Sequence, residues 1–154
     1  MTARKGKNPS ELEIFRDFLK HQGMRYTPER ETIIREIFST HEHFDVDSLY
    51  LSIRQKGHRI SKASIYRLIP LLIQANLIEE VFFEKGQMHY EHIYGHEHHC
   101  HLRCKQCSKI EEFSDHRMAQ IEQDLEKRFG YKVLRHRLDV IGLCKSCQKK
   151  AAGS

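Results

Sequence analysis

The fold of this chain is decided by the stretch SKASIYRLIPLLIQANLIEEVFFEKGQMHYEHI, residues 61–93. It opens with Ser61, a residue type that often caps helices, and residues 62–76 then repeat apolar side chains at the helical spacing. Two strand-like runs follow at 78–83 and 88–93, and the four residues between them include a glycine, which is the signature of a β-hairpin. The stretch therefore predicts a helix that leads directly into a hairpin.

Three shorter helices are expected before this stretch. The first spans Ser10–Gln22, because Ser10 and Glu13 are spaced as a capping box and a glycine follows its last residue. Thr27, followed by a proline, opens the second helix, and the third lies near Asp47–Gln55. Several short helices followed by a hairpin are typical of a winged helix, in which one helix enters the major groove of DNA and the hairpin flanks it.

The helix expected at residues 62–76 has two distinct faces. Its apolar residues point inward, which leaves Lys62, Tyr66 and Arg67 pointing outward. Tyr66 could also be a half-buried packing aromatic. Pro70 lies in the middle of this helix and is expected to kink it after the outward pair, because proline removes one helical hydrogen bond.

The composition is that of a globular protein whose net positive charge suits binding to a polyanion. Of the 154 residues, 26 are Lys or Arg and 21 are Asp or Glu, so the net charge is +5. This charge favours a polyanionic partner without proving one, although the basic residues among the first 62 suit DNA contact. No run approaches the roughly 18 apolar residues of a membrane span, and no apolar stretch marks a signal peptide. We therefore expect a cytosolic protein with no membrane partner.

A second, smaller unit is expected after the hairpin. Its strand-like and helical runs are residues 99–103, 110–113, 115–129 (the helix) and 131–143. A β-β-α-β unit of this size is too small to be stable without a staple or a partner. The sequence therefore predicts a further stabilising element in this region.

Four of the five cysteines supply such an element. They form two Cys-x-x-Cys pairs, Cys104 with Cys107 and Cys144 with Cys147. Each pair presents two thiolates to one metal, and two pairs complete the tetrahedral site that structural zinc favours. Iron in a rubredoxin-like site and redox-active cysteines are the alternatives, but chance rarely gives two such motifs. Zinc here would pin the ends of the small sheet together.

Histidines and carboxylates are concentrated between His89 and His101. His99 and His101 are two residues apart on an expected strand, so their side chains leave the same face. With nearby carboxylates they would make a nitrogen and oxygen site suited to iron(II), manganese, cobalt or zinc. A solvated histidine-rich loop is an equal alternative. A metal-dependent enzyme is a further one, although no zinc-protease, phosphate-loop or nucleophile-elbow motif is present.

Taken together, these motifs resemble the ferric uptake regulator family. The resemblance runs from about Phe18 to Cys147, and the segments that carry it are RYTPER at 25–30, ASIYR at 63–67, HHCHLRCKQC at 98–107, IEEF at 110–113 and the pair at 144 and 147. It implies an α+β fold, with an N-terminal winged-helix DNA-binding domain at residues 1–93 followed by a small α/β dimerisation domain at residues 94–154. It also implies a regulator of transcription and not an enzyme.

The resemblance implies a regulatory metal site and a DNA-binding surface. Carried over position by position, the regulatory ligands fall on His43, Glu91, His99, His101 and Glu112. A ligand set drawn from both domains would make metal binding a conformational switch. The residues that would contact DNA are Arg25, Lys62, Tyr66 and Arg67, with Arg25 in the place of a minor-groove cation.

The chain departs from the family pattern at an additional metal site. His98 and His136 match two of its ligands, but Cys100 stands in place of an Asp and Ala119 in place of a Glu. Glu122, one helical turn beyond Ala119, could substitute. Cys100 could be a soft zinc ligand, an oxidisable thiol or a small residue with no role. Pro70 in the recognition helix is a second departure.

The expected function is that of a dimeric, iron(II)-responsive repressor that binds double-stranded operator DNA and controls metal-uptake genes. Its cofactors would be a structural zinc ion and a regulatory iron(II) ion, with zinc or manganese as alternatives in the regulatory site. A regulator that responds to zinc, manganese or peroxide is the nearest alternative, but peroxide sensors typically carry Asp where this chain has Glu112. Dimers could pair into tetramers, and no small-molecule substrate is expected.

Overall fold

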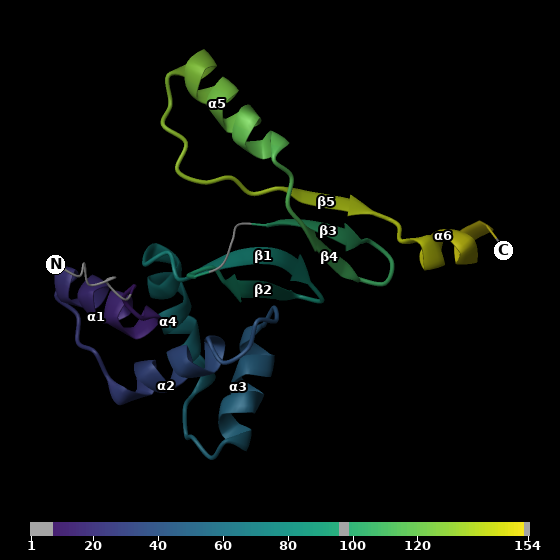
Figure 1. The fold of residues 1–154 in the computed structure, drawn as a ribbon. Helices are drawn as coiled ribbons and strands as arrows, with labels where there is room; N and C mark the ends of the chain where they lie inside the picture. The colour runs from purple at the N-terminus through teal and green to yellow at the C-terminus, as the bar shows by residue number, and fades with distance from the viewer. Residues whose placement is uncertain (1–7, 96–98, 153–154) are drawn as a thin grey trace, which may run out of the picture. The chain divides into compact units, whose positions relative to one another are not determined.

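The computed structural model describes residues 8–95 and 99–152 of the chain. Its elements, in order, are α1 (Glu11–His21), α2 (Pro28–Ile37), α3 (Val46–Gln55), α4 (Lys62–Gln74), β1 (Ile78–Glu84), β2 (Gln87–His92), β3 (Cys100–Cys104), β4 (Ile110–Phe113), α5 (Arg117–Phe129), β5 (Asp139–Gly142) and α6 (Lys145–Ala152) (Figure 1). Contacts divide the chain between residues 96 and 97 into an N-terminal unit and a C-terminal unit. Within the described ranges, no helix is long and apolar enough to cross a membrane.

The N-terminal unit has the expected winged-helix architecture, and the predicted helix starts are confirmed. Ser10 and Glu13 form a reciprocal capping box on α1, and the Thr27 hydroxyl accepts the backbone N–H of Arg30 at the start of α2. The Ser61 hydroxyl likewise caps α4. These side chains satisfy backbone donors that the first turn of a helix leaves without partners.

A single apolar cluster holds the four helices of the N-terminal unit together. Each helix contributes fully buried side chains, including Phe15 from α1, Ile34 from α2, Ile53 from α3 and Ile65 from α4. The apolar spacing of the sequence dictates these faces. The helix α4 continues past Pro70 to Gln74, with the proline exposed.

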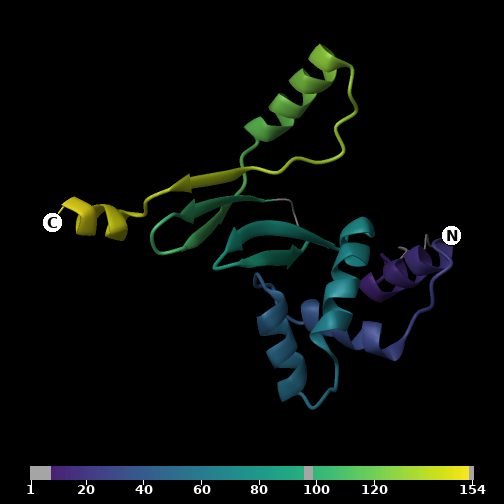
Figure 2. The ribbon, with the colours of Figure 1, turned by 180° about the vertical axis from the view of Figure 1, so that it is seen from behind.

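The wing is an antiparallel hairpin of β1 and β2 that follows α4 directly, as predicted (Figure 2). Its turn consists of Lys85 and Gly86, whose φ angles are 49° and 78°. Two positive φ angles define the turn type whose twist matches that of the flanking strands, and glycine adopts this backbone without strain.

The C-terminal unit contains a three-stranded sheet in the order β4-β3-β5, together with α5 and α6. The strands β3 and β4 are antiparallel, whereas β3 and β5 are parallel. The strand expected over residues 131–143 is confined to Asp139–Gly142, because β3 pairs with β5 only from His101 to Cys104. The helix α6 was not expected from the sequence, since its eight residues lack an apolar face of their own.

Candidate metal centres and DNA-binding surface

The four paired cysteines lie together in the C-terminal unit. One sulfur from each of Cys104, Cys107, Cys144 and Cys147 lies within 4.8 Å of all the others. The Sγ atoms of Cys107 and Cys144 are 3.7 Å apart. Sulfur ligands held 2.3 Å from a zinc ion at tetrahedral angles are about 3.8 Å apart, so the cluster fits zinc. None of these cysteines forms a disulfide.

The local fold explains how two distant pairs of cysteines meet. The parallel register pairs Cys104, the last residue of β3, with Gly142, the last residue of β5. Cys144 follows β5 by two residues, and its backbone N–H donates to the sulfur of Cys104 over 3.4 Å. Cys147 lies one turn further on, in α6, and is buried. The short helix that the sequence did not predict therefore positions the fourth cysteine of the cluster.

Hydrogen bonds within the cysteine cluster shift the pKa values of two of its thiols in opposite directions. Hydrogen bonds from the backbone N–H groups of Cys144 and Cys107 lower the pKa of Cys104 to about 6. By contrast, the hydrogen bond between the side chains of Cys147 and Cys144 raises the pKa of Cys147 to about 12. One thiol therefore ionises readily while a second thiolate beside it is disfavoured, and a doubly charged cation would remove that repulsion.

In the N-terminal unit, His43 and Glu91 are in direct contact. The Nε2 atom of His43 lies 3.1 Å from a carboxylate oxygen of Glu91, and both side chains are largely buried. Phe44 and Tyr90 form an antiparallel bridge with backbone hydrogen bonds of 2.9 and 2.7 Å. The bridge places the preceding His43 opposite Glu91 on β2. Two of the five expected regulatory residues therefore form a nitrogen and oxygen donor pair within this unit.

In the C-terminal unit, three further expected residues form a second donor group. The rings of His99 and His101 are 5.0 Å apart, and His101 pairs in register with Glu112 across β3 and β4. The Nε2 atom of His99 lies 3.6 Å from the Glu112 carboxylate. Asp139 was not expected to take part, yet its carboxylate lies 3.7 Å from Nδ1 of His101. No sequence motif marks Asp139, because only the register of β3 and β5 brings it there.

The additional site can be described only in part. His98 lies outside the described residues. His136 contacts Glu122, whose carboxylate lies 2.7 Å from Nδ1 of the imidazole, whereas Ala119 lies exposed on α5. Burial raises the pKa of the Cys100 thiol, and the negative charges of Asp115 and Asp139 act in the same direction.

The expected DNA-binding residues of α4 lie on its exposed side. Tyr66 is 56% exposed, so it is not a packing aromatic in this unit, and Arg67 is exposed as well. Lys62 is exposed but already engaged, because its ammonium lies 2.6 Å from the carboxylate of Asp47. That carboxylate also accepts a hydrogen bond from Gln87, which directly follows the turn of the wing. Asp47 therefore ties α3 to both α4 and β2.

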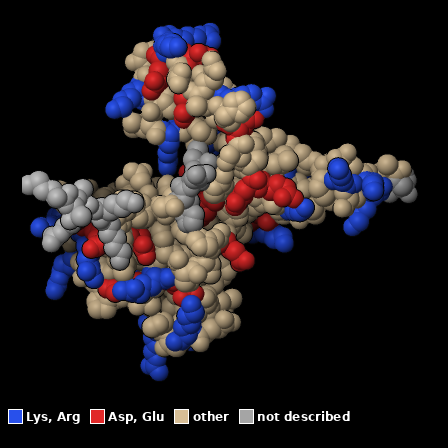
Figure 3. Space-filling model, viewed as in Figure 1, with Lys and Arg blue, Asp and Glu red and all other residues tan. Residues whose placement is uncertain are grey.

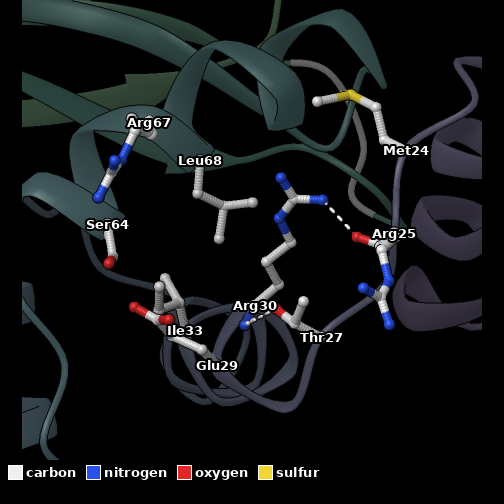
Figure 4. Close-up of a pocket in the computed structure, with 9 residues that line it drawn as sticks. All are labelled: Met24, Arg25, Thr27, Glu29, Arg30, Ile33, Ser64, Arg67 and Leu68. Carbon is white, nitrogen blue, oxygen red and sulfur yellow. Dashed lines mark hydrogen bonds between the residues drawn. The ribbon is translucent and has the colours of Figure 1, made fainter.

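Three arginines line one pocket between α2 and α4. Arg25, Arg30 and Arg67 surround an opening of about 500 Å³ in which Ser64 supplies a hydroxyl (Figure 4). Arg30 donates a hydrogen bond to the backbone carbonyl of Arg25 and so holds the loop before α2 in place. The part played by Arg30 was left open by the sequence, since a surface arginine on a helix has no distinguishing pattern.

Further basic side chains surround the turn between α3 and α4. Lys and Arg side chains project there at the bottom of the view in Figure 3, and Arg54, Lys56 and Arg59 are all exposed. They lie just before the N-terminus of α4, which also favours negative charge because of the helix dipole. The surface around α4 therefore suits an anionic backbone.

Comparison with known proteins agrees with this geometry. The model of the Ferric uptake regulator family matches residues 21–141. The chain is 29% identical over 143 residues to the ferric uptake regulation protein of Campylobacter jejuni, covering 92% of this chain and 90% of that protein. It is also 29% identical over 140 residues to the peroxide-responsive repressor PerR of Staphylococcus aureus, covering 91% and 93% of the two chains.

A solved structure extends the comparison to the fold. The Helicobacter pylori ferric uptake regulator Fur, described as having three functional metal-binding sites, superposes with a TM-score of 0.72 at 31% identity. The match covers 89% of this chain and 91% of that one. These matches, which cover most of the chain, identify a metal-responsive regulator of transcription and not an enzyme. The chain belongs to the ferric uptake regulator family, which confirms the resemblance found in its sequence.

Proposed function

We propose that this protein is an iron(II)-responsive repressor that binds operator DNA as a homodimer and controls metal-uptake genes. The observation that carries the proposal is that each unit supplies its own group of nitrogen and oxygen donors. These groups are His43 with Glu91, and His99 with His101 and Glu112. Imidazole and carboxylate ligands without sulfur suit iron(II) and manganese as well as zinc.

Ligation of one ion by both groups would couple metal binding to DNA binding. The ion would favour the domain arrangement in which all five donors meet, and only by as much as it binds that arrangement better. In a dimer, this would set the two α4 helices at the spacing of successive half-sites on DNA. The cysteine cluster would hold zinc with a structural role, because four thiolates leave no open coordination position.

Peroxide sensing is the second candidate. It is favoured by the similarity to the peroxide-responsive repressor, which equals the similarity to the ferric uptake regulation protein at 29% identity. The carboxylate of Glu112, which stands where peroxide sensors typically carry Asp, weighs against it. We therefore place iron(II) first.

The C-terminal unit supports the homodimer. Large apolar side chains are exposed on it, and they include Ile121, Leu125 and Phe129 at four-residue intervals along α5. No residue of α5 is buried in the single chain. An apolar helix face of this kind is stable in water only when another surface covers it, and a second copy of the unit would do so.

On the DNA side, we propose that Arg25, Tyr66 and Arg67 contact the operator. Tyr66 would reach a base edge or the backbone in the major groove. A DNA phosphate would enter the pocket lined by Arg25, Arg30 and Arg67, because guanidinium groups bind phosphate in pairs of hydrogen bonds. Arg67→Ala should then weaken binding to all DNA sequences alike. It should also reduce the slope of log affinity against log salt concentration by about 1, which corresponds to one lost phosphate contact.

A repressor acts where the DNA is, so we also propose a cytoplasmic location.

The decisive test is an anaerobic DNA-binding titration with iron(II), manganese(II) and zinc(II), with metal content measured on the same samples. We expect iron(II) to raise operator affinity at least tenfold at physiological concentration, and the variant His101→Ala to lose this response while keeping its zinc. His116→Ala, which changes an exposed histidine at the start of α5, is the matched control. An unchanged iron(II) response in His101→Ala would contradict the proposed regulatory site.

A further inference from the structure

Tyr26 is a half-buried side chain in the loop between α1 and α2, and neither the metal centres nor the DNA-binding surface described above includes it. The guanidinium carbon of Arg16, from α1, lies 4.5 Å from the centroid of its ring. The Tyr26 hydroxyl donates a hydrogen bond of 3.0 Å to a carboxylate oxygen of Glu31, from α2. The Nη2 atom of Arg16 lies 3.4 Å from the same oxygen, so each of the three side chains contacts the other two.

A fourth residue holds the Glu31 carboxylate in place. Arg35, one turn further along α2, donates two hydrogen bonds of 3.0 and 2.7 Å to its other oxygen. The hydrogen bonds from Arg35, together with the one from Tyr26, lower the pKa of Glu31, so its negative charge is favoured. An ionised carboxylate accepts a stronger hydrogen bond than a neutral group does. Tyr26 is therefore held at its ring face by a cation and at its hydroxyl by an anion.

The contacts of Tyr26 bear directly on Arg25, the residue before it in the loop. The backbone carbonyl of Arg25 accepts a hydrogen bond from Arg30 of α2 (Figure 4). On the other side, the backbone N–H of Met24 donates to the carbonyl of Leu19 at the end of α1, over 2.8 Å. The backbone around Arg25 is therefore tied to both helices, whereas the Arg25 side chain itself is exposed.

We propose that Tyr26 is a positioning residue for DNA binding, which presents the side chain of Arg25 to the operator. The inference rests on the proposed contact between Arg25 and DNA. An arginine side chain loses rotamer freedom when it binds, so a fixed backbone lowers the cost of bringing its guanidinium to one place. Arg25 lines the same pocket as Arg67 of α4. The conformation of the loop therefore decides whether the two guanidinium groups contact the DNA together.

A role in stability alone is the alternative for these contacts. The helices α1 and α2 already contribute fully buried side chains to one apolar cluster, among them Phe15 and Ile34. Arg16 and Arg35 are exposed, and exposed ion pairs stabilise a fold little. The network around Glu31 is therefore better suited to fixing the loop than to holding the two helices together.

A double-mutant cycle tests the proposal. A DNA duplex is first selected from a random-sequence pool by the full-length protein, loaded with iron(II) under anaerobic conditions. Tyr26→Phe, which removes only the hydroxyl, should weaken binding to this duplex about threefold, and Tyr26→Ala roughly tenfold. In a protein that also carries Arg25→Ala, the same two substitutions should change the affinity by less than about twofold, because no arginine side chain is then left to position.

Repeating the selection with each variant separates positioning from a loss of stability. A destabilised protein binds all DNA sequences more weakly, whereas a misplaced arginine should flatten the base preference only at the positions where Arg25→Ala flattens it. Arg16→Ala should reproduce the result of Tyr26→Phe. Lys20→Ala removes another exposed cation of α1 and is the matched control, which should leave both the affinity and the base preference unchanged.

Three outcomes bear on the proposal in different ways. Additive losses in Tyr26→Phe and Arg25→Ala, or an unchanged affinity in Tyr26→Ala, would overturn it. An unchanged affinity in Arg25→Ala would overturn it together with the proposed DNA contact of Arg25. If the cycle behaves as expected but DNA binding does not depend on iron(II), the positioning role is supported and only the proposed iron response fails.

Discussion

The N-terminal unit encloses an apolar cluster in which side chains such as Phe15, Ile34 and Ile65 have no exposed surface. The C-terminal unit, in contrast, buries only Cys100, His101, Cys104 and Cys147 among its described residues. Many of its large apolar side chains are exposed, up to 86% in Leu134. We therefore expect the N-terminal unit to be stable through its own core and the C-terminal unit to depend on a bound metal ion and a partner surface. This difference decides how each unit should respond to mutation.

The largest effect is expected from Cys144→Ser, which removes one zinc ligand. Structural zinc sites contribute on the order of 10 kcal/mol or more to folding, so the C-terminal unit should lose its structure, its zinc and its dimer, while the N-terminal unit stays folded. Zinc analysis, sedimentation and amide NMR spectra would measure this. Ser146→Ala, between the two cysteines of the same pair, is the control. A zinc-free variant that remains dimeric would show that the cysteines are not a staple.

A smaller effect is expected in the N-terminal unit from Ile65→Ala. Truncating a fully buried isoleucine leaves a cavity and should lower the free energy of unfolding of this unit by about 2–5 kcal/mol. Urea denaturation would measure the change, with zinc content unaltered. The neighbouring Tyr66→Ala is the matched variant, because this exposed side chain should affect DNA binding and leave stability within about 0.5 kcal/mol. Equal destabilisation by the two variants would contradict the assigned core.

On α5 of the C-terminal unit, by contrast, we expect a substitution of an exposed apolar side chain to weaken the dimer. Leu125→Asp places a charge on the exposed apolar face and should raise the dissociation constant of the dimer at least tenfold, which corresponds to about 1.4 kcal/mol, without loss of zinc. Sedimentation at several protein concentrations would measure the constant. Gln123→Asp adds the same charge on another side of the helix and should leave the dimer intact. If both variants dissociate alike, the apolar face is not the interface.

The smallest effect is expected from the ion pair of Glu36. Burial raises the pKa of this carboxyl, but hydrogen bonds from Lys56 and Ser52 outweigh it and lower the pKa below its usual value. A lowered pKa stabilises the folded state above pH about 4.5, and this contribution disappears as the pH falls through the folded-state pKa. Glu36→Gln should therefore cost about 1 kcal/mol at pH 7 and little at pH 3. A constant difference between the proteins from pH 7 to pH 3 would contradict this role.

The sequence predicted the N-terminal unit better than the C-terminal one, and the comparison of the two units explains why. Helices with caps such as Ser10 and Thr27, and a hairpin turn with Gly86, carry local signals that lie next to the elements they define. The extent of β5 depends on its partner β3, which is distant in the sequence. Likewise, α6 contains Cys147 of the cysteine cluster and has no apolar face of its own that would predict it.

The same division holds for the candidate sites. The spacing of the four cysteines was sufficient to expect their cluster, because Cys-x-x-Cys pairs specify a metal geometry. The pocket formed by Arg25, Arg30 and Arg67 was not expected as a unit, since α2 and α4 bring together residues that share no motif. Asp139 beside His101 followed only from the strand register.

The parallel pairing of β3 with β5 also has a consequence for the order of folding. The hairpins β1–β2 and β3–β4 join neighbouring segments and can form within about 1–10 microseconds. Cys104 and Gly142 are 38 positions apart (142 − 104), so their strands must meet by a long chain search that is entropically costly. A zinc ion captured first by Cys104 and Cys107 would shorten that search once Cys144 arrives. The refolding rate of the C-terminal unit should therefore rise with zinc concentration, while that of the N-terminal unit should not.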